Sequence, residues 1–353
     1  MSAVRMSELP GLRLKKVVEY LHAHVPGATG TLRFELISGG RSNITYRVWS
    51  GPRSWVLRRP PLGHVLATAH DMTREFRVLR ALADSPVPVA RPLVLCEDPS
   101  INDVPFYVME DRAGLVLADA IPDGFADAAA DRRRIGDAMI DTMVALHAVD
   151  YVAVGLTGFG RPDGYLGRQV QRWSTQWAGN KTSDLPEIDE LIRRLSAALP
   201  ASPAPTIVHG DFRLGNLALD PNDPGRVVAV YDWEMATLGD PLADLGYTLI
   251  YWADPSEADV SGGWMPSVTA APGFATRAEL VARYAQRSGR DVAAIDFYQV
   301  LALYKLAVIS EGIYKRFTIG QQVGGGGGAR VTVQLAQRAL AIAAASTDPR
   351  LHG

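Results

Sequence analysis

The residues best suited to chemistry lie in one short stretch and one later position. Asp211 follows His209 by two residues and precedes Asn216 by five, and Asp232 comes sixteen residues after Asn216. Each lies at or just after a short apolar run, so a rigid core would hold these side chains at its rim. This order suits phosphoryl transfer, in which one carboxylate orients and deprotonates a hydroxyl while an amide and a second carboxylate hold Mg²⁺ on nucleotide phosphates.

The ordered set resembles the catalytic loop of kinases, in the His-Gly-Asp form of the aminoglycoside phosphotransferase and choline kinase-like family. The resemblance implies that Asp211 is the catalytic base and that His209 braces its loop. It also implies that Asn216 and Asp232 are the Mg²⁺ ligands and that the cofactors are ATP and Mg²⁺. The acceptor would be a hydroxyl of a small molecule.

Further motifs extend this resemblance beyond the loop. The segment 239–245, Gly-Asp-Pro-Leu-Ala-Asp-Leu, matches the family, where its two acidic residues open a helix and support the loop. The segments 212–216 and 233–241 are similar to the kinase-like domains attached to some acyl-CoA dehydrogenases. The resemblance covers most of the chain, and it does not identify the acceptor.

A glycine-containing turn in the first third of the chain could cover phosphates. Gly39, Gly40, Ser42 and Asn43 lie between two strand-like runs, where backbone N–H groups free of bulky side chains could bind ATP. The segment is not a G-x-G-x-x-G motif. By itself it is equally typical of a plain hairpin turn.

The next strand offers a cation for the phosphates. Kinases place a lysine there, whereas this chain has Arg58 and Arg59. Arginine holds phosphate oxygens in a bidentate fork, so the replacement is workable. Side chains alternate along a strand, and this alternation favours Arg58 over Arg59, with Glu75 of the following helix as its partner. A surface arginine and a solvated glutamate are the alternatives.

A second nucleotide contact is expected where the first lobe ends. The run 105–111 finishes a strand at the point where a hinge would lie. In kinases such a segment binds adenine through its backbone, so the resemblance implies this role for Met109 and Glu110. Met109 could equally be an ordinary core residue.

Hydrophobic patterning predicts an α+β chain with a β-rich first part and a helical second part, and the resemblance implies a bilobal protein kinase-like fold. Short strand-like runs dominate the first part, with helices expected at 12–24 and 68–83, and long helical segments follow. We place a nucleotide-binding lobe at residues 1–112 and a catalytic and acceptor-binding lobe at 113–353. The five consecutive glycines of Gly324–Gly328 predict a flexible loop.

Composition excludes several classes of protein. The 353 residues carry a formal net charge of −2, which gives no reason to expect a nucleic-acid or anionic-membrane partner. The single cysteine, Cys96, excludes an internal disulfide and a cysteine-rich zinc site. The first residues lack the apolar segment of a secretory signal, and Lys305 interrupts the apolar run 300–310, so we expect a cytoplasmic protein that does not span a membrane.

Two other functions remain open from the sequence. A pseudokinase would keep the fold and nucleotide binding without transfer, and a metal-dependent phosphoester hydrolase would use the same polar residues with water. The intact Asp211, Asn216 and Asp232 argue against the first, and the scattered histidines argue against the second. The oligomeric state and a preference for ATP over GTP stay open.

The acceptor has only a weak signal in the sequence. Residues 232–259 contain seven acidic residues and no lysine or arginine, which would suit a cationic acceptor. At least four of the seven belong to the motifs above. The other three, Asp254, Glu257 and Asp259, could simply form a solvated loop.

Overall fold

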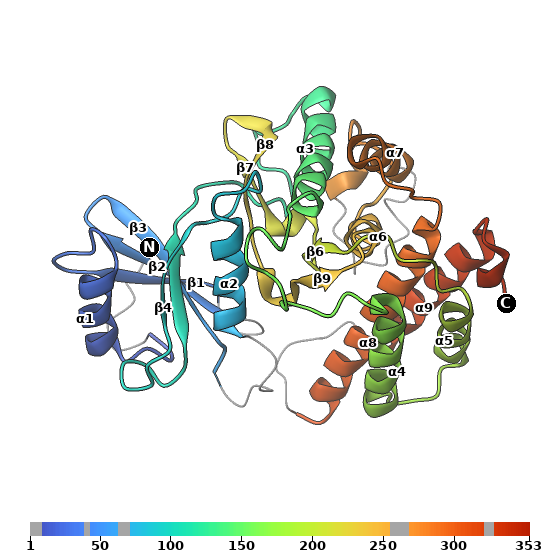
Figure 1. Cartoon of the computed structure of the whole chain (residues 1–353), viewed down its shortest axis with the longest axis horizontal. Helices are drawn as coiled ribbons and strands as arrows, with labels where there is room; N and C mark the ends of the chain where they lie inside the picture. The colour runs from blue at the N-terminus through green and yellow to red at the C-terminus, as the bar shows by residue number, and fades with distance from the viewer. Residues whose placement is uncertain (1–8, 39–42, 63–70, 255–267, 321–327) are drawn as a thin grey trace.

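The computed structural model describes residues 9–38, 43–62, 71–254, 268–320 and 328–353, and it arranges them in two lobes (Figure 1). A small antiparallel sheet with two helices forms the first lobe, and a mostly helical second lobe follows. The small β-rich lobe and the larger helical lobe expected from the sequence are therefore confirmed. The boundary placed at residue 112 stays a prediction.

Five strands form the sheet of the first lobe, in the order β1-β2-β3-β5-β4. They are β1 (Arg33–Ser38), β2 (Ile44–Ser50), β3 (Arg53–Arg59), β4 (Pro92–Cys96) and β5 (Phe106–Glu110). Every neighbouring pair is antiparallel. Arg58 pairs with Thr45 of β2 and with Tyr107 of β5, so it lies on the central strand of the sheet.

Two helices cover the sheet, α1 (Leu14–His24) on its outer side and α2 (Met72–Leu82) between the sheet and the second lobe (Figure 1). The alternation of β3 explains this arrangement, because Leu57 packs in the cluster that contains α1, whereas Val56 packs in the cluster that contains α2. The second cluster is continuous with the core of the helical lobe. Residues on α2 are therefore held at the junction of the lobes.

The second lobe contains the long helices that the sequence predicts, with ends shifted by a few residues. They are α3 (Ala129–His147), α4 (Tyr165–Asn180), α5 (Pro186–Ala197), α6 (Leu242–Ile250), α7 (Arg277–Ser288), α8 (Ile295–Thr318) and α9 (Gly328–Ala345). Helix α8 contacts α4, α6 and α9 and is the centre of the lobe. No helix in the described ranges is long and apolar enough to pass through a bilayer.

The glycine run is only partly described. Residues 324–327 lie outside the described part of the chain, whereas Gly328 begins α9. The prediction of a flexible loop was therefore wrong for Gly328. A glycine is unfavourable in a helix interior but costs less at its first residue, where fewer helical hydrogen bonds depend on it.

Four short strands frame the motif residues. They are β6 (Thr206–Val208), β7 (Leu217–Asp220), β8 (Asp223–Val230) and β9 (Thr237–Gly239). Strand β6 pairs with β9 and β7 pairs with β8, in both cases antiparallel. Strand β9 was not predicted, because three residues are too short for an alternating pattern and pairing with β6 defines the strand. The segments 209–216 and 231–236 therefore both connect these two small sheets.

Candidate active site

A tight turn after β6 carries the first motif residues. Gly210 has a φ of +85°, and a Cβ at this position would lie 2.9 Å from both the Cβ and the carbonyl oxygen of Met235. Glycine is therefore required on both conformational and steric grounds. The turn leaves the side chain of Asp211 19% exposed at the rim of a buried core.

Neighbouring side chains fix the carboxylate of Asp211. The Nδ2 of Asn216 donates to its Oδ2 at 2.7 Å and to the Asp211 carbonyl oxygen at 2.9 Å. The Nε of Arg213 lies 3.3 Å from Oδ1. Both of these bonds are donated by the Nδ2 of Asn216, and no described residue donates to its Oδ1.

The imidazole of His209 connects the two motif segments. Its Nδ1 accepts a hydrogen bond from the backbone N–H of Asp211 at 3.2 Å, and its Nε2 donates to the carbonyl oxygen of Tyr231 at 2.9 Å. The ring is fully buried and lies 4.6 Å from the ring of Trp233. These are the contacts that the expected bracing residue would make, and its role stays a prediction.

A buried carboxylate in the first turn of α6 accepts backbone hydrogen bonds from the turn that carries Asp211. The two oxygens of Asp244 accept the backbone N–H groups of His209 and Gly210, each at 2.7 Å, and the Nε2 of His147 lies 3.2 Å from Oδ2. Burial acts to raise the pKa of Asp244, but His147, His209 and the Gly210 N–H together lower it below its ordinary value. The other acidic residue of this motif, Asp240, accepts the hydroxyl of Tyr298 at 2.7 Å.

Asn216 and Asp232 come together at the end of the β7–β8 hairpin. The N–H of Tyr231 donates to the Asn216 carbonyl oxygen at 2.8 Å, and Asp232 then adopts a left-handed backbone conformation with φ 65°. The Oδ2 of Asp232 has no donor among the described residues. An amide oxygen and a carboxylate oxygen, both without donors, are hard ligands of the kind that Mg²⁺ prefers. The two residues therefore fit the metal that the sequence implied for them.

The pair expected between Arg58 and Glu75 is present. The Nε of Arg58 lies 3.0 Å from Oε2 of Glu75, and an Nη donates to Oδ1 of Asp232 at 2.6 Å. Arg59 is directed elsewhere and donates to the carbonyl oxygens of Gly11 and Pro60. The strand alternation therefore identified the arginine that faces the motif residues. A contact of Arg58 with phosphate stays a prediction.

Glu75 is almost completely buried, and both of its carboxylate oxygens accept hydrogen bonds. It accepts the hydroxyl of Tyr107 at 2.8 Å and the Nδ2 of Asn43 at 2.9 Å, in addition to its ion pair with Arg58. Burial raises the pKa of Glu75, and Arg58 opposes that rise. The sequence offered no signal for Tyr107, which reaches Glu75 from β5. This network holds the guanidinium of Arg58 at the junction between the lobes.

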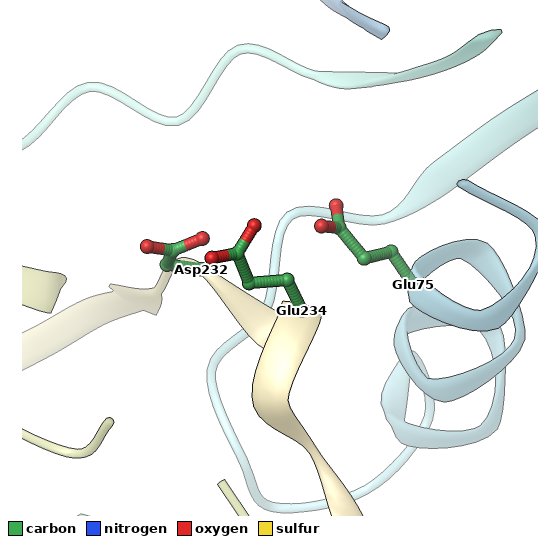
Figure 2. Close-up of side chains that lie close together, drawn as sticks. All are labelled: Glu75, Asp232 and Glu234. Carbon is green, nitrogen blue, oxygen red and sulfur yellow. The ribbon is translucent and has the colours of Figure 1, made fainter. Parts of the chain in front are cut away.

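Sequence reasoning also missed Glu234, two residues after Asp232. Carboxylate oxygens of Glu75, Asp232 and Glu234 all lie within 4.8 Å of one another, and Figure 2 shows the three side chains gathered from α2 and the segment after β8. Burial, together with the charges of Asp232 and Glu75, raises the pKa of Glu234 to about 7. The local signal was the Asp-Trp-Glu order itself, whose second acidic residue was given no role.

The other expected nucleotide contacts have different outcomes. Gly39, Gly40 and Ser42 lie outside the described residues, whereas Asn43 is buried beside Glu75. Met109 is 7% exposed and belongs to the core. Glu110 ends β5 with its N–H bonded to the Arg91 carbonyl oxygen at 2.9 Å and its carboxylate 2.8 Å from Arg112. Binding of adenine by Met109 and Glu110 stays a prediction.

A hollow adjoins the turn that carries Asp211. Gly210 lines it together with side chains of α4, α6 and α8, among them Trp173, Tyr247 and Lys305. No pattern in the sequence indicated this hollow, because its walls come from three helices that are far apart along the chain.

Comparison with known proteins agrees with this geometry. The model of the phosphotransferase enzyme family matches residues 33–298. A solved structure from Ralstonia eutropha, assigned by name to the aminoglycoside phosphotransferases, is 33% identical, with a TM-score of 0.77 over 92% of this chain and 98% of that chain. Choline kinase from Cryptosporidium parvum is 13% identical, with a TM-score of 0.62 over 93% of this chain and 95% of that one, and it shows a shared fold.

Curated relatives include much longer proteins. Acyl-CoA dehydrogenase family member 10 of Mus musculus is 38% identical over 83% of this chain and 27% of its own length. Acyl-CoA dehydrogenase family member 11 of the same organism is 34% identical over 87% of this chain and 40% of its own length. The chain thus spans less than half the length of these relatives. The region that the family model matches, residues 33–298, includes both small sheets of the second lobe and every motif residue from Asn43 to Asp244. The chain therefore belongs to the phosphotransferase enzyme family.

Proposed function

We propose that the protein transfers the γ-phosphoryl group of ATP, in the presence of Mg²⁺, to a hydroxyl of a small molecule. The observation that carries this proposal is the arrangement of Asp211, Asn216 and Asp232 on one connected frame. Asp211 is partly exposed and held by a 2.7 Å bond from Asn216, whose carbonyl oxygen accepts the N–H of Tyr231, the residue before Asp232, at 2.8 Å. Membership of the phosphotransferase family supports the same class of reaction.

The residues have distinct duties in this reaction. Asp211 accepts the proton of the acceptor hydroxyl while the acceptor oxygen forms its bond to the γ-phosphorus. The bond from that phosphorus to the bridging oxygen breaks, and its electron pair leaves with ADP. Asn216 and Asp232 would hold Mg²⁺, which supplies positive charge to the phosphate oxygens. Arg58 would bind phosphate oxygens through N–H groups other than those that contact Glu75 and Asp232.

The pseudokinase alternative shares every step except the transfer. An Nη of Arg58 lies 2.6 Å from Oδ1 of Asp232, the proposed metal ligand. This arrangement would also suit a protein that only binds nucleotide. The test must therefore measure binding and turnover separately.

The variant Asp211→Asn makes this separation. It keeps the size of the side chain and removes the proton acceptor, so ATP affinity should stay within about threefold of wild type. Release of ADP with a panel of hydroxylated small molecules should fall by about two orders of magnitude or more. The matched control is Asp184→Asn, a highly exposed carboxylate on another face of the lobe, which should change neither quantity. Near-normal turnover in Asp211→Asn would contradict the proposal, and normal ATP binding with no turnover by wild type would favour the pseudokinase.

A further inference from the structure

Lys305 projects from the middle of α8 toward the turn that carries Asp211. Its Nζ donates to the carbonyl oxygen of Gly210 at 2.8 Å and lies 4.4 Å from the centre of the Tyr247 ring. Burial lowers the pKa of Lys305 to about 8, against the raising effect of Asp211 and Asp244. The side chain is half-buried, and its ammonium group lies against the turn that carries Asp211.

This cation has no ion pair within the described part of the chain. The bond to Gly210 is its one hydrogen bond to a described residue, although an ammonium group can donate three. A half-buried ammonium group loses part of its hydration, and a polar or charged partner can replace what is lost. The unused donors of Lys305 line the hollow beside Gly210, so a ligand in that hollow could supply the missing partner.

The walls of the hollow fit the same kind of ligand. They are mostly aromatic and apolar side chains and include no carboxylate among the described residues: Tyr165, Gln169, Trp173, Ala243, Tyr247, Tyr298, Leu301 and Ala302. A cationic ligand would find Lys305 on these walls, and the carboxylate of Asp211 lies outside the lining. Asp254, which belongs to the acidic run that suggested a cationic acceptor, is instead bonded to the backbone N–H of Arg277 at 2.9 Å.

The hollow lies close to the proposed catalytic carboxylate, although Asp211 itself does not line it. Gly210, which lines it, precedes Asp211 directly, and Tyr247, another lining residue, has its ring centre 4.4 Å from the Nζ of Lys305. The nearness of Tyr247 to Asp211 shows in its pKa, which burial and then the charge of Asp211 raise well above the ordinary value. A small molecule in the hollow would therefore have one end beside Lys305 and another within reach of Asp211.

We propose that this hollow binds the acceptor through an anionic oxygen group, a carboxylate or a phosphate, held by Lys305. The inference rests on the proposed phosphotransfer and defines the class of acceptor, a hydroxylated anion with an apolar part that lies against the aromatic walls. The bond from Lys305 to Gly210 orients the ammonium and leaves its other donors to the ligand. Lys305 is then a residue that determines specificity, and it takes no proton from the reacting hydroxyl.

The experiment compares acceptors that differ in charge. The probes are β-hydroxybutyrate, its uncharged methyl ester, glycerol phosphate and choline, each measured by ADP release and by the shift in melting temperature. The variant is Lys305→Met, and the control is Lys315→Met on the same helix, whose Nζ also donates to a backbone carbonyl, that of Gly179 at 2.6 Å, but is exposed. Unliganded melting of each variant shows that it folds.

Wild type should favour the anionic probes, and the better of the two identifies a carboxylate or a phosphate as the preferred group. Lys305→Met should raise KM for that probe about 10- to 100-fold, the usual effect of losing a hydrogen bond to a charged group, with kcat changed less than about threefold. The methyl ester should respond little to the substitution. Lys315→Met should behave as wild type.

Three results would overturn the inference: a preference for choline, an equal loss for the ester and the anions in Lys305→Met, or anions that neither bind nor react. Failure of the proposed function looks different. If no probe releases ADP, yet an anion raises the melting temperature of wild type and not of Lys305→Met, the anion site stands and the transfer reaction is wrong.

Discussion

The carboxylate of Asp244 offers the sharpest test of how the turn that carries Asp211 is held. It is fully buried, and each of its oxygens accepts one backbone N–H, from His209 and Gly210, at 2.7 Å. The substitution Asp244→Ala removes both acceptors from a site that water does not reach. Asp244→Asn keeps one oxygen and turns an amide N–H group toward the other backbone donor.

The magnitude follows from the number of stranded donors, which are the two backbone N–H groups and the Nε2 of His147. A buried donor without a partner costs about 1–3 kcal/mol, so Asp244→Ala should lower the free energy of unfolding by about 3–9 kcal/mol, and Asp244→Asn, which keeps one acceptor oxygen, by less. Asp150→Ala is the matched control, because Asp150 also accepts two backbone N–H groups, from Val152 at 2.9 Å and Ala153 at 3.1 Å, but in an exposed turn. Water replaces those bonds, and the loss should stay below about 1 kcal/mol.

The assay is urea unfolding at several pH values. The folded pKa of Asp244 lies below its ordinary value, so its ionised form stabilises the fold above the unfolded pKa of about 3.9, and this contribution is lost as the pH falls through the folded pKa. The difference in stability between wild type and Asp244→Ala should therefore be constant near neutral pH and shrink below about pH 4. A loss no larger than that of Asp150→Ala, or a difference that grows in acid, would refute this reasoning.

Two further predictions concern the helices that carry the site, and both are measured by urea unfolding. Gly246→Ala should lower the free energy of unfolding by about 1–3 kcal/mol, because a Cβ at this position of α6 would lie 2.6 Å from the Cβ of Tyr298 and force α6 away from α8. The control is Gly179→Ala, whose added Cβ would have no atom within 4 Å and should not destabilise the protein. Thr276→Ala should cost about 1 kcal/mol, because it removes the capping box that Thr276 forms with Glu279 at the start of α7, and an unchanged stability would show that this cap contributes nothing.

The parts of the site that could be predicted from the sequence are those with a local pattern. Asp211 and Asn216 are five residues apart on one turn, so their closeness along the chain also brings them close in space. The choice of Arg58 over Arg59 needed only the alternation of a strand, which sterics fix without reference to the rest of the fold. The contact between Arg58 and Glu75 required one further assumption, that the next helix packs on the same face of the sheet.

The residues that were missed depend on contacts between distant segments. Tyr107 reaches Glu75 from a neighbouring strand, and β9 becomes a strand only by pairing with β6. Lys305 lies 94 residues after Asp211, on a helix whose position depends on packing against α4 and α6. Its one signal in the sequence was that it interrupts the apolar run 300–310, and that break was used only to exclude a membrane span.

The two sides of Asp211 carry opposite charge, and this asymmetry favours a direction for each ligand. On the side of the first lobe, the carboxylates of Glu75, Asp232 and Glu234 lie within 4.8 Å of one another, and Arg58 pairs with Glu75 and Asp232. A divalent cation brought by a nucleotide would be attracted to carboxylates spaced so closely, since repulsion between carboxylates is strong where water is scarce. On the side of the hollow, Lys305 faces walls whose described residues are mostly aromatic and include no carboxylate, so an anion gains there what a cation would lose. These charges favour nucleotide on the side of Arg58 and the acceptor on the side of Lys305, with Asp211 between them.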